Sequence, residues 1–253
     1  MKLISLVLIL SFASFETHAC AQHEAKDYLK NILWITEEHP PYNYSEPNGE
    51  LSGISVDILS LVYRELGMEL QRKTILNVPW ARLFHNVKNY SQNAAFSMAT
   101  TDERSKLFHL VALPFKAKVS IMVLKERQEL LSQKKLNELN VAVVRRDMGH
   151  QLLELQKLPV NKALTINTNS MLKMLIKGRV DAIAYAEDTA IFELAKIADD
   201  QIVPIYELEG HALYNYAFNN DTPQCVIDLF SSILNDLDRN GVLSPIRDKY
   251  LHH

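Results

Sequence analysis

Apolar and polar positions alternate with two different periods along most of this chain. Short apolar runs, such as residues 32–36 and 94–98, are typical of buried strands. Residues 56–66 instead repeat an apolar residue every three or four positions, which predicts a helix that ends at Gly67. In order, we expect the first half to contain strand 32–36, helix 56–66, strand 70–75, helix 80–88 and strand 94–98.

The same alternation begins again after an extended segment at residues 117–124 and a charged, glutamine-rich helical stretch. Residues 22–30 are mainly polar, and we expect them to be frayed. Strands that alternate with helices predict an α/β fold with a largely parallel sheet. The elements expected in the second half are strand 141–144, helix 171–177, strand 182–185, helix 191–198, strand 213–218 and helix 226–237.

Two successive units of strands and helices predict two lobes. We infer that residues 22–118 form the first part of lobe one and residues 119–212 form lobe two. Residues 213–253 then return to lobe one as a strand and terminal helices. Open α/β sheets bind ligands at the carboxyl ends of their strands, so the cleft between the lobes is the expected site.

Residues 1–21 have the pattern of a secretory signal peptide, because a charged start and an apolar segment precede an Ala-x-Ala cleavage signal. We expect cleavage after Ala21 and export to the periplasm. Lipid anchoring at Cys20 is the less favoured alternative. If Cys20 leaves with the signal, Cys225 remains as a free thiol and no intrachain disulfide can form.

Composition argues against several classes of function. The 253-residue chain is 47% hydrophobic, which is enough for a packed core, and its formal net charge is -3. Its basic residues are dispersed, whereas nucleic-acid binding normally needs a clustered basic face. Glycines number only seven, and the motifs of serine hydrolases, zinc proteases and phosphate-binding loops are absent from the sequence. We expect a monomer without a cofactor, metal or nucleic-acid partner.

Residues 96–104 are the most informative stretch, because a strand end, a helix start and an arginine occur close together. Thr100 and Glu103 have the spacing of a capping box, which predicts a helix N-terminus beside the Arg104 guanidinium. Free N–H groups, a helix dipole and a guanidinium together predict an anion site, and a small carboxylate fits it. The alternative is that Arg104 is a surface residue of an ordinary helix.

Four stretches together resemble the bacterial extracellular solute-binding proteins of the polar amino-acid family, family 3. They are residues 36–44 with Pro-Pro-Tyr, residues 49–57 with Gly-Glu-Leu-Ser-Gly and Val-Asp, residues 97–104, and the tail at 238–250. The resemblance covers nearly the whole mature chain. It implies a periplasmic binding protein type II fold, in which two hinge strands join two α/β lobes. Such lobes close over a small ligand, which is then delivered to an ABC-type permease.

The resemblance also implies roles for two residues of the 97–104 stretch. It implies that Arg104 clamps the α-carboxylate of the ligand and that Ser97 assists it. A guanidinium and a carboxylate form an oriented, bidentate pair in a cleft that excludes water. We therefore expect a small ligand that carries a carboxylate, such as an amino acid.

Three positions depart from the family pattern and leave the rest of the ligand open. Ala99 replaces a small hydroxyl residue of the carboxylate site. Arg145 and Arg146 lie where relatives have a Gly-Ser/Thr turn, and this extra positive charge either faces the cleft or is turned away from it. Ala186 replaces the acidic residue that usually receives the ligand amino group. The nearby candidates for that role are Tyr185, Glu187 and Asp188.

Further candidates for the cleft come from the loop after the first strand and from the start of helix 80–88. Aromatic side chains there can stack on the ligand, and acidic side chains can pair with a ligand cation or with a neighbouring arginine. Core packing is the alternative for the aromatic residues. His39 has no second metal ligand at a suitable spacing, so we expect it to be a wall residue. These candidates are Glu37, Glu38, His39, Tyr42, Tyr44 and Trp80.

Two other functions fit the same architecture. A periplasmic dehydratase of cyclic acids would use a buried carboxyl group as a general acid, and Glu38 or Glu187 is the candidate for it. A sensory component would report the ligand to a membrane kinase or cyclase. We favour a binding protein that is not an enzyme, with a permease or a sensor as its membrane partner.

Overall fold

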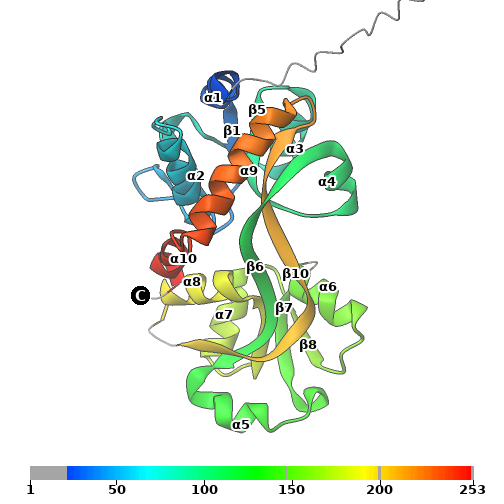
Figure 1. Ribbon diagram of the computed structural model, residues 1–253. Coiled ribbons are helices and arrows are strands. Elements are labelled where there is room, and N and C mark those ends of the chain that lie inside the picture. Colours follow the sequence, from blue (N-terminus) through cyan, green and yellow to red (C-terminus); the bar gives the residue numbers. More distant parts are fainter. Residues whose placement is uncertain (1–21, 146, 199–200, 252–253) are drawn as a thin grey trace, which may run out of the picture.

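Two lobes joined by two long strands make up the protein (Figure 1). The computed structural model describes residues 22–145, 147–198 and 201–251. The expected signal peptide, with Cys20, and Arg146 lie outside these residues. The joining strands are β6 (Phe108–Leu124) and β10 (Ile202–Asn219), which pair antiparallel over most of their length. The α/β, two-lobed type II fold expected from the sequence is confirmed.

Strands of both lobes share one eight-stranded sheet in the order β4-β1-β5-β10-β6-β9-β7-β8. Within each lobe the outer strands are parallel to one another, and the antiparallel pair β6 and β10 crosses between the lobes. The remaining strand bounds are β1 (Leu33–Thr36), β2 (Tyr44–Ser45), β3 (Leu51–Ser52), β4 (Leu76–Asn77), β5 (Asn93–Ala99), β7 (Asn140–Val144), β8 (Asn161–Thr165) and β9 (Ala182–Ala186).

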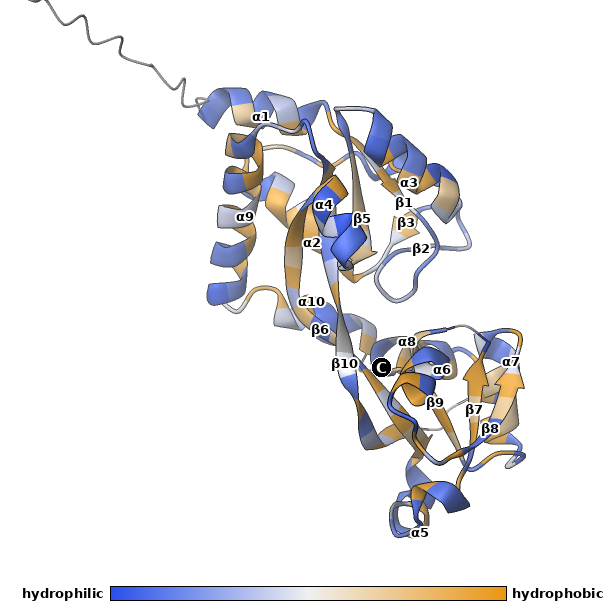
Figure 2. Ribbon diagram, turned by 90° about the vertical axis from the view of Figure 1, so that its right-hand side faces the viewer, coloured by the Kyte–Doolittle hydropathy of each residue, from blue (hydrophilic) through white to orange (hydrophobic). Residues whose placement is uncertain are grey.

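Helices cover the sheet in both lobes, and the apolar residues gather on the sheet and on the inward helix faces (Figure 2). The α-helices are α1 (Gln22–Lys30), α2 (Ile54–Glu65), α3 (Trp80–Asn89), α4 (Asp102–Leu107), α5 (Gln128–Ser132), α6 (Met148–Leu155), α7 (Thr168–Ile176), α8 (Glu187–Ala195), α9 (Gln224–Arg239) and α10 (Ser244–Leu251). Short 3-10 turns occupy Arg72–Thr74, Lys125–Arg127 and Leu136–Glu138. No helix among the described residues is long and apolar enough to cross a membrane.

The hydrophobic cores of the two lobes meet along the joining strands. Along β6, Ala117 packs in the core of lobe one and Val119 packs in the core of lobe two. Along β10, which runs back, Leu208 packs in the core of lobe two and Tyr214 packs in the core of lobe one. The core of lobe one is centred on Trp34, whose ring packs against several aromatic rings of α2, β5, β10 and α9. Each lobe therefore has its own core, except that Phe192 of α8 in lobe two packs with the core of lobe one.

Two elements differ from the sequence-based expectation. Residues 22–30 form α1 instead of a frayed end, because Ala25 and Leu29 are buried where α1 packs on α9. Residues 70–75 are not a strand, since a 3-10 turn occupies Arg72–Thr74 and the strand that follows is the two-residue β4, which pairs with β1. Both differences arise from contacts with distant elements, which a local pattern does not contain.

Cys225, near the start of α9, is not the free thiol expected from the sequence. It is disulfide-bonded, and the described part of the chain contains no free cysteine. The only other cysteine of the chain is Cys20.

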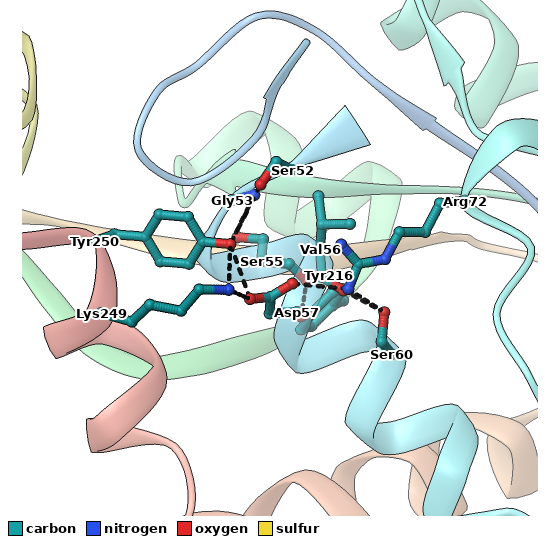
Figure 3. A network of polar contacts seen from close by, with 10 residues as sticks. All are labelled: Ser52, Gly53, Ser55, Val56, Asp57, Ser60, Arg72, Tyr216, Lys249 and Tyr250. Carbon is teal, nitrogen blue, oxygen red and sulfur yellow. Dashed lines mark hydrogen bonds and ion pairs between the residues drawn. The ribbon is translucent and has the colours of Figure 1, made fainter. Parts of the chain in front are cut away.

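A polar network fastens the C-terminal helix to lobe one (Figure 3). Asp57 of α2 accepts hydrogen bonds from Lys249 Nζ and Tyr250 Oη of α10 at 2.8 Å each, and from Arg72 Nη2 at 2.7 Å. Burial raises the pKa of Asp57, but these donors outweigh it and hold the pKa below its usual range. The Asp57 carboxylate thus holds together α2, α10 and the turn before β4.

Candidate functional site

A cavity of about 380 Å³ lies between the two lobes. Lobe one contributes segments around β1, β5, α3, α4 and β10, and lobe two contributes α6, β9 and α8. A cavity of this size holds a small solute. Its lining residues are Glu37, His39, Trp80, Ser97, Ala99, Arg104 and Tyr214 from lobe one, and Asp147, Met148, Gln151, Tyr185, Ala186 and Thr189 from lobe two.

Arg104 is held in place by two contacts within lobe one. Its Nη1 donates a hydrogen bond to the Ala99 carbonyl oxygen at 2.8 Å, and its guanidinium lies 4.3 Å from the centre of the Trp80 ring. Burial lowers the pKa of Arg104, while the nearby Glu37 and Glu103 carboxylates raise it. No acidic residue of the described chain lies within ion-pair distance of Arg104. Its other N–H groups are available to a bound anion.

The helix that carries Arg104 begins one residue later than the sequence suggests. Thr101, not Thr100, is the N-cap of α4, and its side chain accepts the Arg104 backbone N–H at 3.2 Å. Thr100 is instead tied to β10, since its backbone N–H donates to the Leu213 carbonyl oxygen at 2.9 Å. The predicted pairing of Thr100 with Glu103 was wrong because β5 continues its pairing with β10 as far as Ala99.

Ser97 has an unusual backbone conformation for a residue with a side chain. Its φ is 58°, in the left-handed region that favours glycine, within a strand that is otherwise regular. The pairing of β10 shifts register opposite this point, between Asn215 and Ala217. The Ser97 hydroxyl reaches the Ser55 hydroxyl at 2.8 Å. Strained backbone of this kind is concentrated at functional sites.

His39 contributes a buried polar atom to the wall of lobe one. Its ring stacks on Tyr42, with ring centres 5.5 Å apart, and meets the edge of Tyr214 at 4.9 Å. Burial lowers the pKa of His39 to about 4, so the ring is neutral at pH 7. Its Nε2 is buried and has no hydrogen-bond partner among the described residues. A ligand group can supply that partner.

The wall of lobe two is built by the close approach of α6 to β9. A Cβ atom at Gly149 would lie 2.1 Å from the Ala184 carbonyl oxygen, so only glycine lets the helix start there. Asp147 is the N-cap of α6 and accepts the Gly149 N–H at 3.3 Å. Burial raises the pKa of Asp147, although the N–H groups of Gly149 and Met148 lower it.

The structure brings several of the sequence-predicted site residues together around the cavity. Those that line it are Glu37, His39, Trp80, Ser97, Arg104 and Tyr185. They come from three separate segments of lobe one and from one strand of lobe two.

Other sequence-predicted residues lie elsewhere. Glu38 is exposed and accepts hydrogen bonds from Ser45, so it is not part of the lining. Tyr42 is buried, and its hydroxyl donates to Asp188 at 2.8 Å. Glu187 accepts the Ser120 hydroxyl at 2.5 Å. Each of these side chains has a partner inside the protein.

Arg145 and Arg146 were expected to place a cation at the cleft. Arg145 is exposed and is not a lining residue. Arg146 lies outside the described residues. The cation of the cavity described here is therefore Arg104.

Five lining residues were not assigned to the site from the sequence, namely Asp147, Met148, Gln151, Thr189 and Tyr214. Tyr214 lies in the strand expected at residues 213–218. The alternation of side-chain directions along that strand was the only feature of the sequence that pointed to Tyr214. Thr189 and Gln151 lie one turn inside α8 and α6, where the sequence shows an ordinary amphipathic pattern. Nothing in the local pattern marks them as residues of a cleft.

Comparison with known proteins gives a consistent result. The family model for bacterial extracellular solute-binding proteins, family 3, matches residues 32–253. An arginine-binding periplasmic protein of Mannheimia haemolytica is 23% identical over 230 residues, which span 88% of this chain and 91% of that protein. Among solved structures, an ancestral cationic amino acid solute-binding protein superposes with a TM-score of 0.73 at 19% identity. That match covers 90% of this chain and 99% of the other.

One enzyme is also similar. The membrane-bound lytic murein transglycosylase F of Nitrosospira multiformis is 22% identical over 240 residues, or 90% of this chain. The match covers only 48% of that enzyme. The similarity therefore concerns about half of the transglycosylase.

Proposed function

We propose that this chain, which belongs to family 3 of the bacterial extracellular solute-binding proteins, captures an amino acid or a related small carboxylate. The ligand binds between the lobes and is then passed to an ABC-type permease. The observation that carries the proposal is Arg104, a half-buried guanidinium that lines the cavity and has no ion-pair partner in the described chain. The similar arginine-binding protein supports an amino acid as the ligand class.

The proposed binding of the carboxylate follows from the geometry around Arg104. The hydrogen bond to Ala99 uses one N–H of the guanidinium, and stacking on Trp80 fixes its plane. The remaining N–H groups can donate to both oxygens of one carboxylate. The Ser97 hydroxyl lies on the same wall of the cavity and can add a further donor.

Closure of the lobes would strengthen this contact. Water is removed from the cavity when the lobes meet, and charged hydrogen bonds are stronger where solvent is excluded. The two crossing strands, β6 and β10, are the connections about which the lobes would move. Apart from Phe192, which packs with lobe one, each lobe keeps its own core, so such a movement leaves most buried contacts intact.

A thermal-shift screen tests the proposal. The twenty standard L-amino acids are compared with their methyl esters, which lack the carboxylate but keep the ammonium and the side chain. A ligand that binds only the folded protein raises its Tm. We expect at least one free amino acid to raise the Tm, and its methyl ester to have little effect. Equal shifts with acid and ester would contradict the role of Arg104.

The enzyme alternative has less support from the site. Glu38 and Glu187, the candidates for a general acid, are not among the lining residues. Glu37 does line the cavity, and burial raises its pKa although the Arg104 charge lowers it. Mass spectrometry of the ligand recovered after prolonged incubation separates the two functions. We expect the compound to be recovered unchanged.

A further inference from the structure

One side of α6 extends from the cavity described above into a second cavity. Met148 and Gln151 line the first cavity, and both also line the second, which has a volume of about 470 Å³. The other residues of the second cavity are Leu152, Leu155 and Gly210. Positions three, four and seven residues after Met148 lie on one face of a helix. We call this second cavity the α6 groove, and it continues the first cavity along that face.

The α6 groove is mainly apolar. Three of its four side chains are those of Met148, Leu152 and Leu155, and none of the described residues that line it is charged. Leu155 is 77% exposed. A single exposed leucine is normal on a protein surface. Leu155, however, ends an apolar stripe that begins inside the candidate site, which indicates a contact surface for a ligand.

The strand β10 forms the opposite side of the groove and leaves it open. The pairing of β10 with β6 shifts register between Glu207 and His211, and Gly210 lies within this irregular stretch. The φ of Gly210 is 106°, in the region that favours glycine. A Cβ atom there would lie 3.4 Å from Leu152 Cδ2. A larger side chain at this position would therefore begin beside Leu152, where the groove now has space.

Two hydrogen bonds fix the distance between the two sides of the groove. Gln156, just after α6, donates from Nε2 to the Glu209 carbonyl oxygen at 2.7 Å. The Glu209 backbone N–H donates in return to Gln156 Oε1 at 3.1 Å. This pair holds the end of α6 against β10 next to Gly210. The groove is thus formed before a ligand arrives, which lowers the cost of binding.

We propose that the α6 groove receives an apolar extension of the ligand, so that the protein prefers amino acids with long apolar side chains to short ones. Arg104 holds the carboxylate, and the hydrocarbon chain passes Met148 and lies along α6. The flexible, polarizable side chain of methionine adapts to such a chain. This inference rests on the proposed function, since it takes Arg104 as the anchor.

A homologous series of straight-chain amino acids measures the use of the groove. Calorimetric titration of the parent protein compares L-α-aminobutyrate, L-norvaline, L-norleucine and L-α-aminooctanoate. Each methylene that leaves water for an apolar contact favours binding. Because the groove is partly open to solvent, we expect the affinity to rise by about two- to fourfold for each added methylene. An affinity that stays constant along the series would contradict the inference.

Leu155→Glu is the variant that tests the location of the hydrocarbon chain. Glutamate forms helices well, so the change places a charge in the groove without breaking α6. The matched control is Leu130→Glu on α5, where Leu130 is 64% exposed and lines neither cavity. We expect Leu155→Glu to weaken binding of L-α-aminooctanoate at least fivefold and to leave L-α-aminobutyrate unchanged. Leu130→Glu should bind both as the parent does.

The short ligand serves as an internal control for folding. If Leu155→Glu weakens the short and the long ligand equally, the effect does not arise in the groove and the inference is wrong. If L-α-aminooctanoate binds Leu155→Glu as tightly as it binds the parent, its chain does not lie along α6, and the inference is also wrong.

Failure of the inference can be distinguished from failure of the proposed function. If the parent shows no gain along the series while Arg104→Gln loses binding of an amino acid that the parent binds, the groove is not used and the proposed function stands. If neither the series nor any of the twenty standard L-amino acids binds the parent, both fail.

Discussion

Arg247 of lobe one and Asp188 of lobe two form an ion pair across the cleft, with Nη2 and Oδ1 2.5 Å apart. Asp188 is 4% exposed and also accepts the Tyr42 hydroxyl at 2.8 Å. Burial lowers the pKa of Arg247, but the Asp188 carboxylate outweighs it and raises the pKa overall. Asp188 directly precedes Thr189, so this contact between α8 and α10 lies next to the candidate site.

Loss of this ion pair should loosen the contact between the lobes. Asp188→Asn leaves Arg247 and Tyr42 without their charged acceptor, and we expect a loss of about 2 kcal/mol in the free energy of unfolding. This value is below that of a fully buried pair because the Arg247 side chain is 33% exposed. Urea denaturation measures the loss, and small-angle scattering should show a larger radius of gyration. An unchanged radius would argue that the pair does not hold the lobes together.

A matched control for that prediction lies in lobe one. Arg239 pairs with Asp236 within α9, and the Arg239 side chain is 75% exposed. Arg239→Gln should cost less than about 0.5 kcal/mol, because exposed pairs contribute little. A comparable loss of unfolding free energy in both variants would mean that the position of Asp188 between the lobes does not add to its effect on stability.

Replacement of Arg104 should abolish most ligand binding. We expect Arg104→Gln to weaken binding of an amino acid on the order of a hundredfold, since a buried charged partner is lost. Isothermal titration calorimetry measures the change. Arg82→Gln, at an exposed position of α3, serves as the control and should bind as the parent does. Parent-like affinity in Arg104→Gln would refute the anchor.

The left-handed backbone at Ser97 predicts that a glycine there affects ligand binding more than it affects stability. In Ser97→Gly the strain at φ 58° is relieved, so the unfolding free energy should change by less than about 1 kcal/mol despite the lost hydrogen bond to Ser55. Ligand affinity should nevertheless fall by about tenfold, because the hydroxyl is gone. Ser97→Val should lower stability more than glycine does. If glycine keeps full affinity, the hydroxyl does not contact the ligand.

His39 should make the stability of the protein depend on pH. Its pKa is about 4 in the folded state, against an ordinary value of 6.5, so the unfolded chain binds the proton more readily. Its contribution to stability is therefore present above pH 6.5 and is lost as the pH falls toward 4. We expect the loss to be on the order of 2 kcal/mol for this group.

The measurement compares urea unfolding at pH 7 and pH 4.5. In His39→Gln, which has no group that titrates there, the fall in stability between the two pH values should be smaller than in the parent. His85→Gln, at an exposed ring on α3, should fall as the parent does. Identical pH dependence in all three proteins would show that His39 is not buried as a neutral ring.

Much of the secondary structure is visible in the sequence, because burial repeats along a regular element. The apolar run at 94–98 lies within β5, and the helix expected at 80–88 corresponds to α3. Local patterns did not predict the secondary structure of segments whose conformation depends on contacts with distant parts of the chain. The polar stretch at 22–30 is helical because α9 covers its two buried residues. Residues 70–75 do not form a strand, because the pairing with β1 involves only the next two residues, Leu76 and Asn77.

For the candidate site, the strand-to-helix junction predicted a role for Arg104, the family resemblance implied one for Ser97, and both residues line the cavity. The sequence also marked Trp80, since a proline places the start of α3 there. It could not separate Glu37 from Glu38, because adjacent residues on an extended segment point in opposite directions and the direction depends on the neighbours. In the fold, Glu37 lines the cavity and Glu38 is bonded to Ser45.

The sequence by itself determined the class of fold and the family and pointed to Arg104, which lines the cavity, since each depends on the order and spacing of residues along the chain. Only the tertiary structure decided which groups share the cavity. Asp147, Thr189 and Tyr214 come from α6, α8 and β10, and they meet because the two long strands return the chain across the cleft. Hydrogen bonds, burial and the field between charges act through space, so residues far apart in the chain determine one another's chemistry.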